Sequence, residues 1–78
     1  MAAEMWRLDD ENWAFYCDVE HKAIHRSIRR SKGWDEMATY QKNDKLIAIQ
    51  YRLPATSSDY RKARRLVFRV HDSGGTDA

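Results

Sequence analysis

The sequence predicts a small α+β domain in which one long N-terminal helix packs on a three-stranded antiparallel β-meander, in the order α-β-β-β. Three observations predict this fold: a helix-like run over residues 10–32, alternating apolar positions over 45–53, and a second alternating run over 65–71. A chain of 78 residues has room for one domain, which we place at 1–72 with a flexible tail at 73–78.

The expected helix at 10–32 is marked best at its ends. Asp9 is placed to cap the N-terminus, and Gly33 suits the left-handed residue that follows a helix. On a helical wheel the apolar side chains cover an arc of roughly 220°, which is wider than contact with one small sheet requires. We therefore expect part of this arc to contact a second copy of the chain in a two-fold dimer. The apolar residues of the arc are Trp13, Phe15, Tyr16, Cys17, Val19, Ala23, Ile24 and Ile28.

The second half of the chain predicts three strands. A strand at 45–53 ends at Pro54, and a weaker strand at 37–42 precedes it through a short turn at Asn43-Asp44. The last strand is expected at 65–71, and the residues just before it are either a helical turn capped by Ser57 or Ser58 or the beginning of that strand. The expected core consists of Trp13, Tyr16, Val19, Ile24 and Ile28 against Ile47, Ile49, Tyr51, Leu53, Leu66, Phe68 and Val70.

Composition excludes several classes of protein. Hydrophobic residues make up 42% of the chain and nine residues are aromatic, so the chain as a whole is not of the disordered type. A single cysteine allows no internal disulfide, which favours a reducing compartment. The sequence contains no stretch of about 18 apolar residues, and its first residues lack the basic start and apolar run of a signal peptide, so we expect none. We expect a cytoplasmic protein that does not contact membranes.

No residue pattern predicts catalysis, a cofactor or a bound metal. Cys17, His21 and His25 recur every four residues, with His71 as a conceivable fourth zinc ligand, but the ends of such a helical stripe lie about 12 Å apart. Glu20 falls inside the apolar arc, where a carboxylate acts as a general base in a small cleft. The simpler interpretations are that Glu20 lies at an uncovered part of the arc or meets an arginine from the sheet or from a second chain. We therefore expect a protein that is not an enzyme.

Basic residues form two separate blocks. Residues 21–34 carry five cations and no acid, and residues 60–71 carry five more without an acid. Alternation in the last predicted strand places Arg65 and Arg69 on the outer sheet face beside Arg52 of the neighbouring strand. Such a face suits phosphates and guanine edges, while an ordinary solvated basic surface is the competing interpretation. The expected binding residues are Arg52, Arg65, Arg69, Gln50, Arg29, Arg30 and Trp6.

These observations favour a small regulatory or inhibitory module that acts by binding another macromolecule. The preferred partner is a protein, such as a nucleic-acid-handling enzyme, because spare aromatic residues and segregated charge are typical of protein contacts. The alternative is a nucleic-acid-binding protein that uses a basic sheet face.

Overall fold

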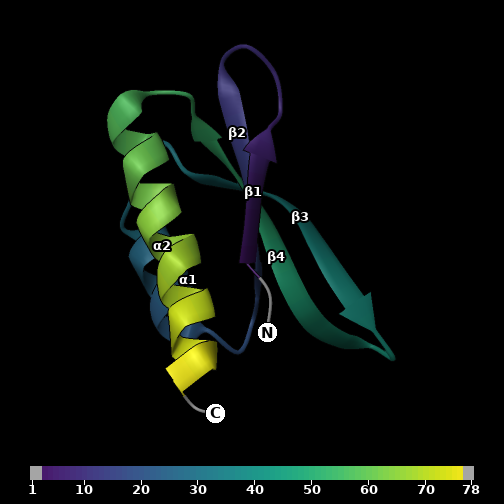
Figure 1. The fold of residues 1–78 in the computed structure, drawn as a ribbon. Helices are drawn as coiled ribbons and strands as arrows, with labels where there is room; N and C mark the ends of the chain where they lie inside the picture. The colour runs from purple at the N-terminus through teal and green to yellow at the C-terminus, as the bar shows by residue number, and fades with distance from the viewer. Residues whose placement is uncertain (1–2, 77–78) are drawn as a thin grey trace.

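Four strands form one antiparallel sheet, and two helices cover one of its faces (Figure 1). The strand order is β1-β2-β4-β3, so the two central strands come from different halves of the chain. The structure is a computed structural model that describes residues 3–76, with side chains as far as residue 71. In chain order the elements are β1 (Ala3–Arg7), β2 (Asn12–Asp18), α1 (Lys22–Arg29), β3 (Asp35–Lys42), β4 (Lys45–Pro54) and α2 (Ser57–Thr76).

The predicted long N-terminal helix is wrong, because the first half of 10–32 is a strand. β2 pairs with β1 on one side and with β4 on the other, which places Phe15 opposite both Met5 and Tyr51. Aromatic side chains of this segment lie on both faces of the sheet, and apolar groups on both faces of a strand give the same wide arc when drawn as a helix. Asp9 caps a turn of the β1–β2 loop instead of a helix, since its Oδ1 accepts a hydrogen bond from the Glu11 amide at 2.8 Å.

The second half of the predicted helix is partly correct. α1 has only eight residues, and it buries Ile24, His25 and Ile28 against the sheet. The chain then turns through Gly33, whose φ of +85° is the left-handed conformation that the sequence predicted at this position.

The hairpin formed by β3 and β4 is confirmed. Its turn consists of Asn43 and Asp44, both with positive φ (53° and 64°), as a two-residue turn that matches the twist of the strands requires. Pro54 is the last residue of β4. The pairing of β3 with β4 shifts register twice, between Glu36 and Ala38 and between Tyr40 and Gln41.

The predicted last strand at 65–71 is wrong, because these residues belong to α2. The alternative prediction, a helical turn just before residue 65, is correct in that the segment is helical, but the helix continues far beyond one turn. Its N-cap is neither Ser57 nor Ser58. Thr56 Oγ1 accepts a hydrogen bond from the Asp59 amide at 3.1 Å, and the Thr56 carbonyl accepts the first helical bond, from the Tyr60 amide at 2.9 Å. Of the expected tail at 73–78, the backbone as far as Thr76 is helical and residues 77–78 lie outside the described residues.

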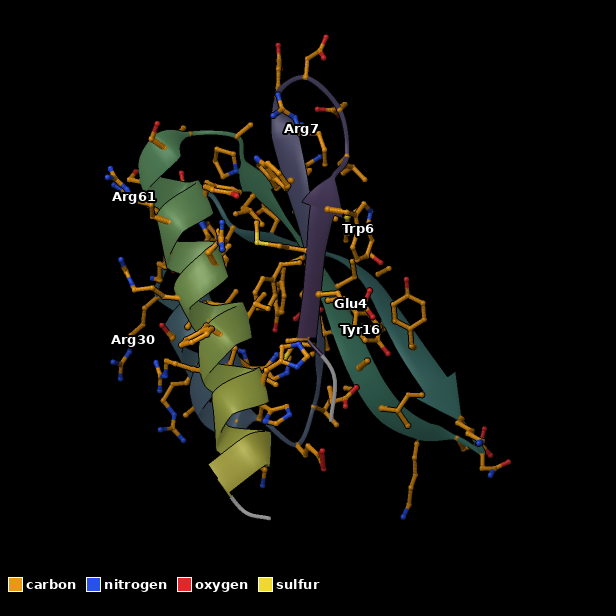
Figure 2. All side chains as sticks on the ribbon, viewed as in Figure 1. Glu4, Trp6, Arg7, Tyr16, Arg30 and Arg61 are labelled. Atoms are coloured by element: carbon orange, nitrogen blue, oxygen red, sulfur yellow. The ribbon has the colours of Figure 1, made fainter. Side chains whose placement is uncertain are left out.

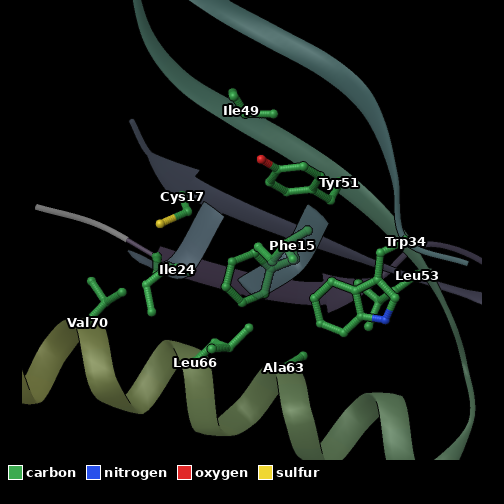
Figure 3. Close-up of a cluster of buried hydrophobic side chains, with 12 residues drawn as sticks. Phe15, Cys17, Ile24, Trp34, Ile49, Tyr51, Leu53, Ala63, Leu66 and Val70 are labelled. Carbon is green, nitrogen blue, oxygen red and sulfur yellow. The ribbon is translucent and has the colours of Figure 1, made fainter. Parts of the chain in front are cut away.

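A single apolar layer lies between the sheet and the helices (Figure 3). Trp34 belongs to it: its ring packs 6.1 Å from that of Phe15, and its indole nitrogen donates a 2.8 Å hydrogen bond to Asp59 Oδ1. Three residues expected in the core lie elsewhere, namely Tyr16 on the uncovered face of the sheet and the exposed side chains of Ile47 and Phe68. The buried cluster consists of Ala3, Phe15, Cys17, Ile24, Ile28, Trp34, Ile49, Tyr51, Leu53, Ala63, Leu66 and Val70.

Two leucines of the same strand test this layer. Leu53 is 0% exposed and Leu46 is 42% exposed. We expect Leu53→Ala to lower the free energy of unfolding by about 2–5 kcal/mol, because it leaves a cavity in the core. Leu46→Ala, the matched control, should cost less than about 1 kcal/mol. Urea unfolding followed by tryptophan fluorescence measures both, and equal losses would contradict the assignment of the core.

Candidate functional site

The outer surface of the two helices carries most of the positive charge of the molecule. Both basic blocks of the sequence lie here, although about thirty residues of sheet and loop separate them. Nine of the ten side chains are exposed and Lys62 is half-buried. Residues 22–32 and 57–71 contain one carboxylate, that of Asp59. We call this surface the basic helix layer; its cations are Lys22, Arg26, Arg29, Arg30, Lys32, Arg61, Lys62, Arg64, Arg65 and Arg69.

These cations are not paired with acids within the part of the chain whose side chains the structure describes. In that part the one ion pair is between Arg52 and Asp35, which lies on the sheet. Figure 2 shows Arg30 and Arg61 pointing away from the sheet, with other nitrogen-bearing side chains gathered on the same side of the helices. Among the described side chains the layer therefore presents cations without paired carboxylates to solvent, which favours contact with a polyanion.

Specific contacts join the two helices into one surface. Lys62 on α2 donates a hydrogen bond to Ser31 Oγ just beyond α1, and its ammonium lies 5.7 Å from the centre of the Trp34 ring. Farther along, Arg69 of α2 and Lys22 of α1 line the same small depression. The two basic blocks thus meet at one end of the helix pair through Lys62 and Ser31. At the other end Lys22 and Arg69 share a depression that Glu20 also lines.

A second chain of contacts orients part of α2. The Trp13 ring packs against the Tyr60 ring with centroids 5.0 Å apart, and the Arg64 guanidinium lies 5.8 Å from the centre of the Tyr60 ring. Arg64 Nη1 also donates a hydrogen bond to the Tyr60 hydroxyl oxygen at 3.3 Å. An open groove of about 910 Å³ runs beside α2 and includes Trp13, Tyr60, Arg64 and Phe68 in its walls. The positive charge of Arg64 is thereby held beside aromatic surface.

The face of the sheet that the helices leave uncovered carries several aromatic side chains. Trp6 and Tyr40 are each 39% exposed, and the Tyr16 ring meets the Tyr40 ring edge-on at 5.3 Å. Figure 2 shows Trp6, Glu4 and Tyr16 directed away from the helices. We call this surface the open sheet face. Its exposed apolar groups are typical of protein contacts.

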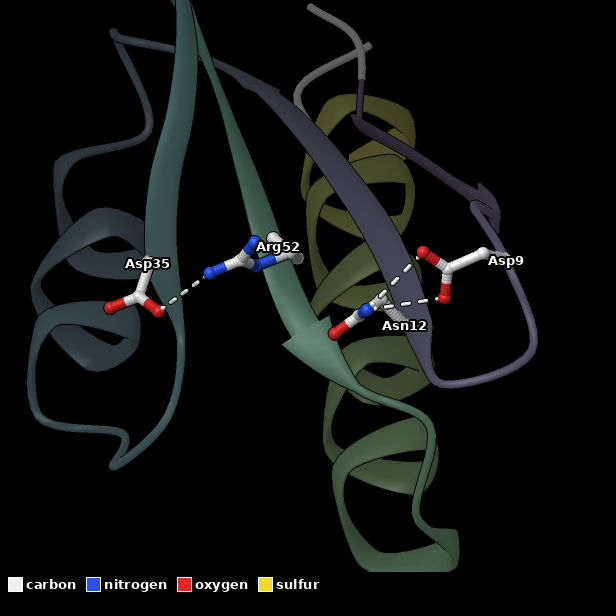
Figure 4. A network of polar contacts seen from close by, with 4 residues as sticks. All are labelled: Asp9, Asn12, Asp35 and Arg52. Carbon is white, nitrogen blue, oxygen red and sulfur yellow. Dashed lines mark hydrogen bonds and ion pairs between the residues drawn. The ribbon is translucent and has the colours of Figure 1, made fainter.

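Polar contacts fix the central side chains of the open sheet face. Gln50 is 7% exposed, accepts a 2.5 Å hydrogen bond from the Tyr40 hydroxyl and donates one to Met37 Sδ at 3.3 Å. Arg52 reaches Asp35 Oδ2 at 3.5 Å across the β3–β4 pair (Figure 4). The Gln50 amide is therefore committed to its neighbours within the sheet.

The structure separates the residues that the sequence grouped in one basic patch. Arg52 and Gln50 lie on the open sheet face, whereas Arg65 and Arg69 are on α2, which covers the other face. The expectation of a shared patch is wrong because it depended on a strand at 65–71. Trp6 also lies on the open sheet face.

Arg29 and Arg30 of the first basic block join Arg65 and Arg69 in the basic helix layer. Sequence reasoning missed that the two blocks converge. The spacing of Ala63, Leu66 and Val70, three and then four residues apart, is the spacing of one helix face and indicates that this segment is helical.

The cysteine and histidine residues of the predicted stripe have separate structural roles. Cys17 is buried in β2, and His71 Nε2 lies 3.0 Å from the Ala3 carbonyl oxygen. Both nitrogens of the buried His25 ring are used, one with the Tyr51 hydroxyl at 2.7 Å and the other with the Asp18 carbonyl at 2.8 Å. A stripe on one helix does not exist.

The ligand atoms of Asp18, Glu20 and His21, at the end of β2 and in the following turn, do lie within 4.8 Å of one another. Exposed acidic groups often meet in this way in proteins that bind no metal, and the grouping alone assigns no ion. Glu20 is exposed here rather than part of an apolar helix face.

The single thiol is not poised for nucleophilic chemistry. Burial, with a smaller contribution from the nearby Asp18 carboxylate, raises the pKa of Cys17 to about 12. The thiolate is the reactive form, so the protonated thiol of the folded protein is a poor nucleophile at neutral pH.

Comparison of the chain with known protein families, with curated proteins and with solved structures finds no match. Among the described residues, neither helix combines the length and the apolar character needed to cross a bilayer.

The burial of Cys17 can be tested by alkylation. At about pH 8.5, where an ordinary thiol is half ionised, we expect iodoacetamide to label the folded protein far more slowly than the urea-unfolded chain. Mass spectrometry at successive times measures the two rates at this single site. Equal rates would contradict both the burial and the raised pKa.

Proposed function

We propose that this chain binds nucleic acid through the basic helix layer, with arginine and lysine side chains on the phosphate backbone. The observation that carries this proposal is the convergence of two acid-free blocks on one surface, where none of their cations pairs with a described carboxylate. Closely spaced like charges repel one another, and a polyanion relieves that repulsion while releasing its counterions.

The distribution of acids supports a defined orientation of the bound polyanion. Six acids and one arginine lie between residues 1 and 20, which include β1, β2 and their connecting loop. The acidic residues of this segment therefore lie mainly on the first two strands and their loop, whereas the basic residues lie on the helices. A phosphate backbone is attracted to the helices and repelled by the β1–β2 loop.

This proposal changes the surface expected from the sequence. The sequence alternative placed nucleic acid on a basic sheet face, but the open sheet face has one described arginine, and that arginine already pairs with Asp35. The preferred expectation of a protein partner, including a nucleic-acid-handling enzyme, stays a prediction, and no residue contact identifies such a partner.

Charge reversal with a matched control tests the proposal. In the test variant, Arg30→Glu changes the C-cap of α1 and Arg65→Glu changes α2. In the control, Lys42→Glu and Lys45→Glu change the far end of the β3–β4 hairpin by the same charge. We expect the test variant to bind a fluorescein-labelled oligonucleotide about tenfold or more weakly, with a salt slope smaller by about two phosphate contacts. Fluorescence anisotropy between about 50 and 200 mM salt measures both quantities.

The control variant should keep most of the affinity of the unchanged protein. Two results would contradict the proposal. One is that the unchanged protein binds no oligonucleotide at the lowest salt. The other is that both variants lose the same affinity, because net charge rather than the basic helix layer would then govern binding.

A second candidate function is protein binding by the open sheet face, with a second copy of the chain as the partner. The wide helical arc that first suggested a dimer does not exist, but Trp6, Met37 and Tyr40 are each about 40% exposed on this face. The pair of Arg52 and Asp35 supplies both signs of charge, as the self-complementary surface of a two-fold dimer needs.

Sedimentation tests the dimer. We expect the mass to rise across roughly a hundredfold range of concentration, because association follows mass action. Trp6→Ser combined with Tyr40→Ser should leave a monomer throughout, while the double change Lys42→Glu and Lys45→Glu should still dimerise. A monomeric mass of the unchanged protein at the highest concentration would contradict this candidate.

A further inference from the structure

Phe68 is the most exposed large apolar side chain among the described residues. It is 72% exposed, whereas the other exposed large apolar side chains of this part of the chain lie between 36% and 43%. The core positions of α2 are taken by Ala63, Leu66 and Val70, so Phe68 lies on the side of the helix turned away from the core. Leaving a phenylalanine in water forgoes its hydrophobic stabilisation, and folding does not account for its position.

Arginines surround this ring on the helix surface. Arg64 and Arg65 precede Phe68 by four and three residues, and Arg61 precedes it by seven, so all three share its side of α2. All three are exposed, and none pairs with a carboxylate among the side chains that the structure describes. Arg64 is further held by Tyr60, as described above. The result is one accessible aromatic ring within a group of cations.

This combination matches single-stranded nucleic acid better than a duplex. An unpaired base has two free faces, and it can stack on a phenylalanine while the neighbouring phosphates meet arginines. In a duplex the bases are already stacked, so the same ring contacts a base face only after the helix has been opened or kinked.

A lipid surface fits the helix less well. Helices that lie in a membrane interface insert a continuous apolar stripe. The apolar stripe of α2 is buried against the sheet, which leaves a single ring to insert.

We infer that Phe68 is a stacking platform for an unpaired base, and that Arg61, Arg64 and Arg65 hold the flanking phosphates of a single strand. This inference rests on the proposed function, since it names the form of nucleic acid that the basic helix layer binds. The inference also places the main contact of the basic helix layer with nucleic acid on the outward side of α2.

Binding of the full chain to two labelled probes tests the inference: a mixed-sequence single-stranded DNA oligonucleotide and the duplex of the same length. We expect the unchanged protein to bind the single strand more tightly at equal salt. Phe68→Ala should weaken single-strand binding by roughly 5- to 150-fold, the range of one lost base–aromatic stack, and should change duplex binding little.

Two further measurements separate stacking from other effects. Phe68→Trp, the matched control, keeps an aromatic surface and should retain single-strand affinity. The salt slope of Phe68→Ala should equal that of the unchanged protein, because no phosphate contact is removed. Since the side chain is exposed, the urea midpoint of either variant should stay close to that of the unchanged protein.

The outcomes distinguish the inference from the proposed function. Failure of the unchanged protein to bind either probe would overturn both. Equal affinity for the two probes, with no effect of Phe68→Ala, would overturn the inference and leave phosphate binding by the helices intact. An equal loss on both probes would also overturn it. Binding to vesicles of anionic and neutral phospholipid that depends on Phe68, without oligonucleotide binding, would assign the ring to a lipid surface instead.

Discussion

Burial of one apolar layer is the constraint on which the rest of this structure depends. A chain of 78 residues builds a single such layer, with Phe15 and Leu53 fully buried at its centre. Each helix can reach the layer with only one side, because the layer has the sheet as its other wall. The charged residues of the helices as far as residue 71 are therefore directed outward or to the margin. The basic surface is thus a geometric result of how α1 and α2 bury their few apolar residues, and it brings together charges that are distant in the sequence.

Two interactions of Asp59 connect this layer to the start of the second basic block. Its carboxylate accepts a hydrogen bond from the buried Trp34 ring and one from the Thr56 hydroxyl, at 2.8 Å and 2.6 Å. The first contact positions the beginning of α2 over the core, and the second belongs to the turn that caps the helix. Asp59 is also the one acid in residues 22–32 and 57–71, and each of its oxygens accepts one of these hydrogen bonds. These two donors hold the carboxylate at the start of α2, and no described ion pair joins it to a cation of the layer.

The sequence predicted the β3–β4 hairpin, its turn and the left-handed glycine because each depends on local chemistry. Asn43-Asp44 and Gly33 satisfy backbone conformations that few residues adopt, whatever the rest of the chain does. The pattern of residues 12–18 does not predict a strand, because apolar side chains such as Phe15 and Tyr16 lie on both of its faces and no alternation of apolar and polar residues results. The pairing of this segment with β1 and β4 is what makes it a strand. In α2, Leu66 and Val70 are four residues apart, which fits the period of a helix and that of a strand. Choosing the strand placed Arg65 and Arg69 on the sheet. The separate basic blocks were visible, but their meeting is a property of the fold.

The irregular pairing of β3 has a consequence for how the molecule behaves among its own copies. β3 is an outer strand, and a long regular outer strand offers unsatisfied amide and carbonyl groups on which a strand of another molecule can add. The register shift between Glu36 and Ala38 leaves Met37 as an extra residue in β3, which breaks that regular array and increases the local twist. At the opposite border of the sheet, the Ala3 carbonyl is already in contact with His71. Addition of a strand from another molecule to β3 is therefore disfavoured, because β3 is irregular. Such strand addition is the first step towards a fibril.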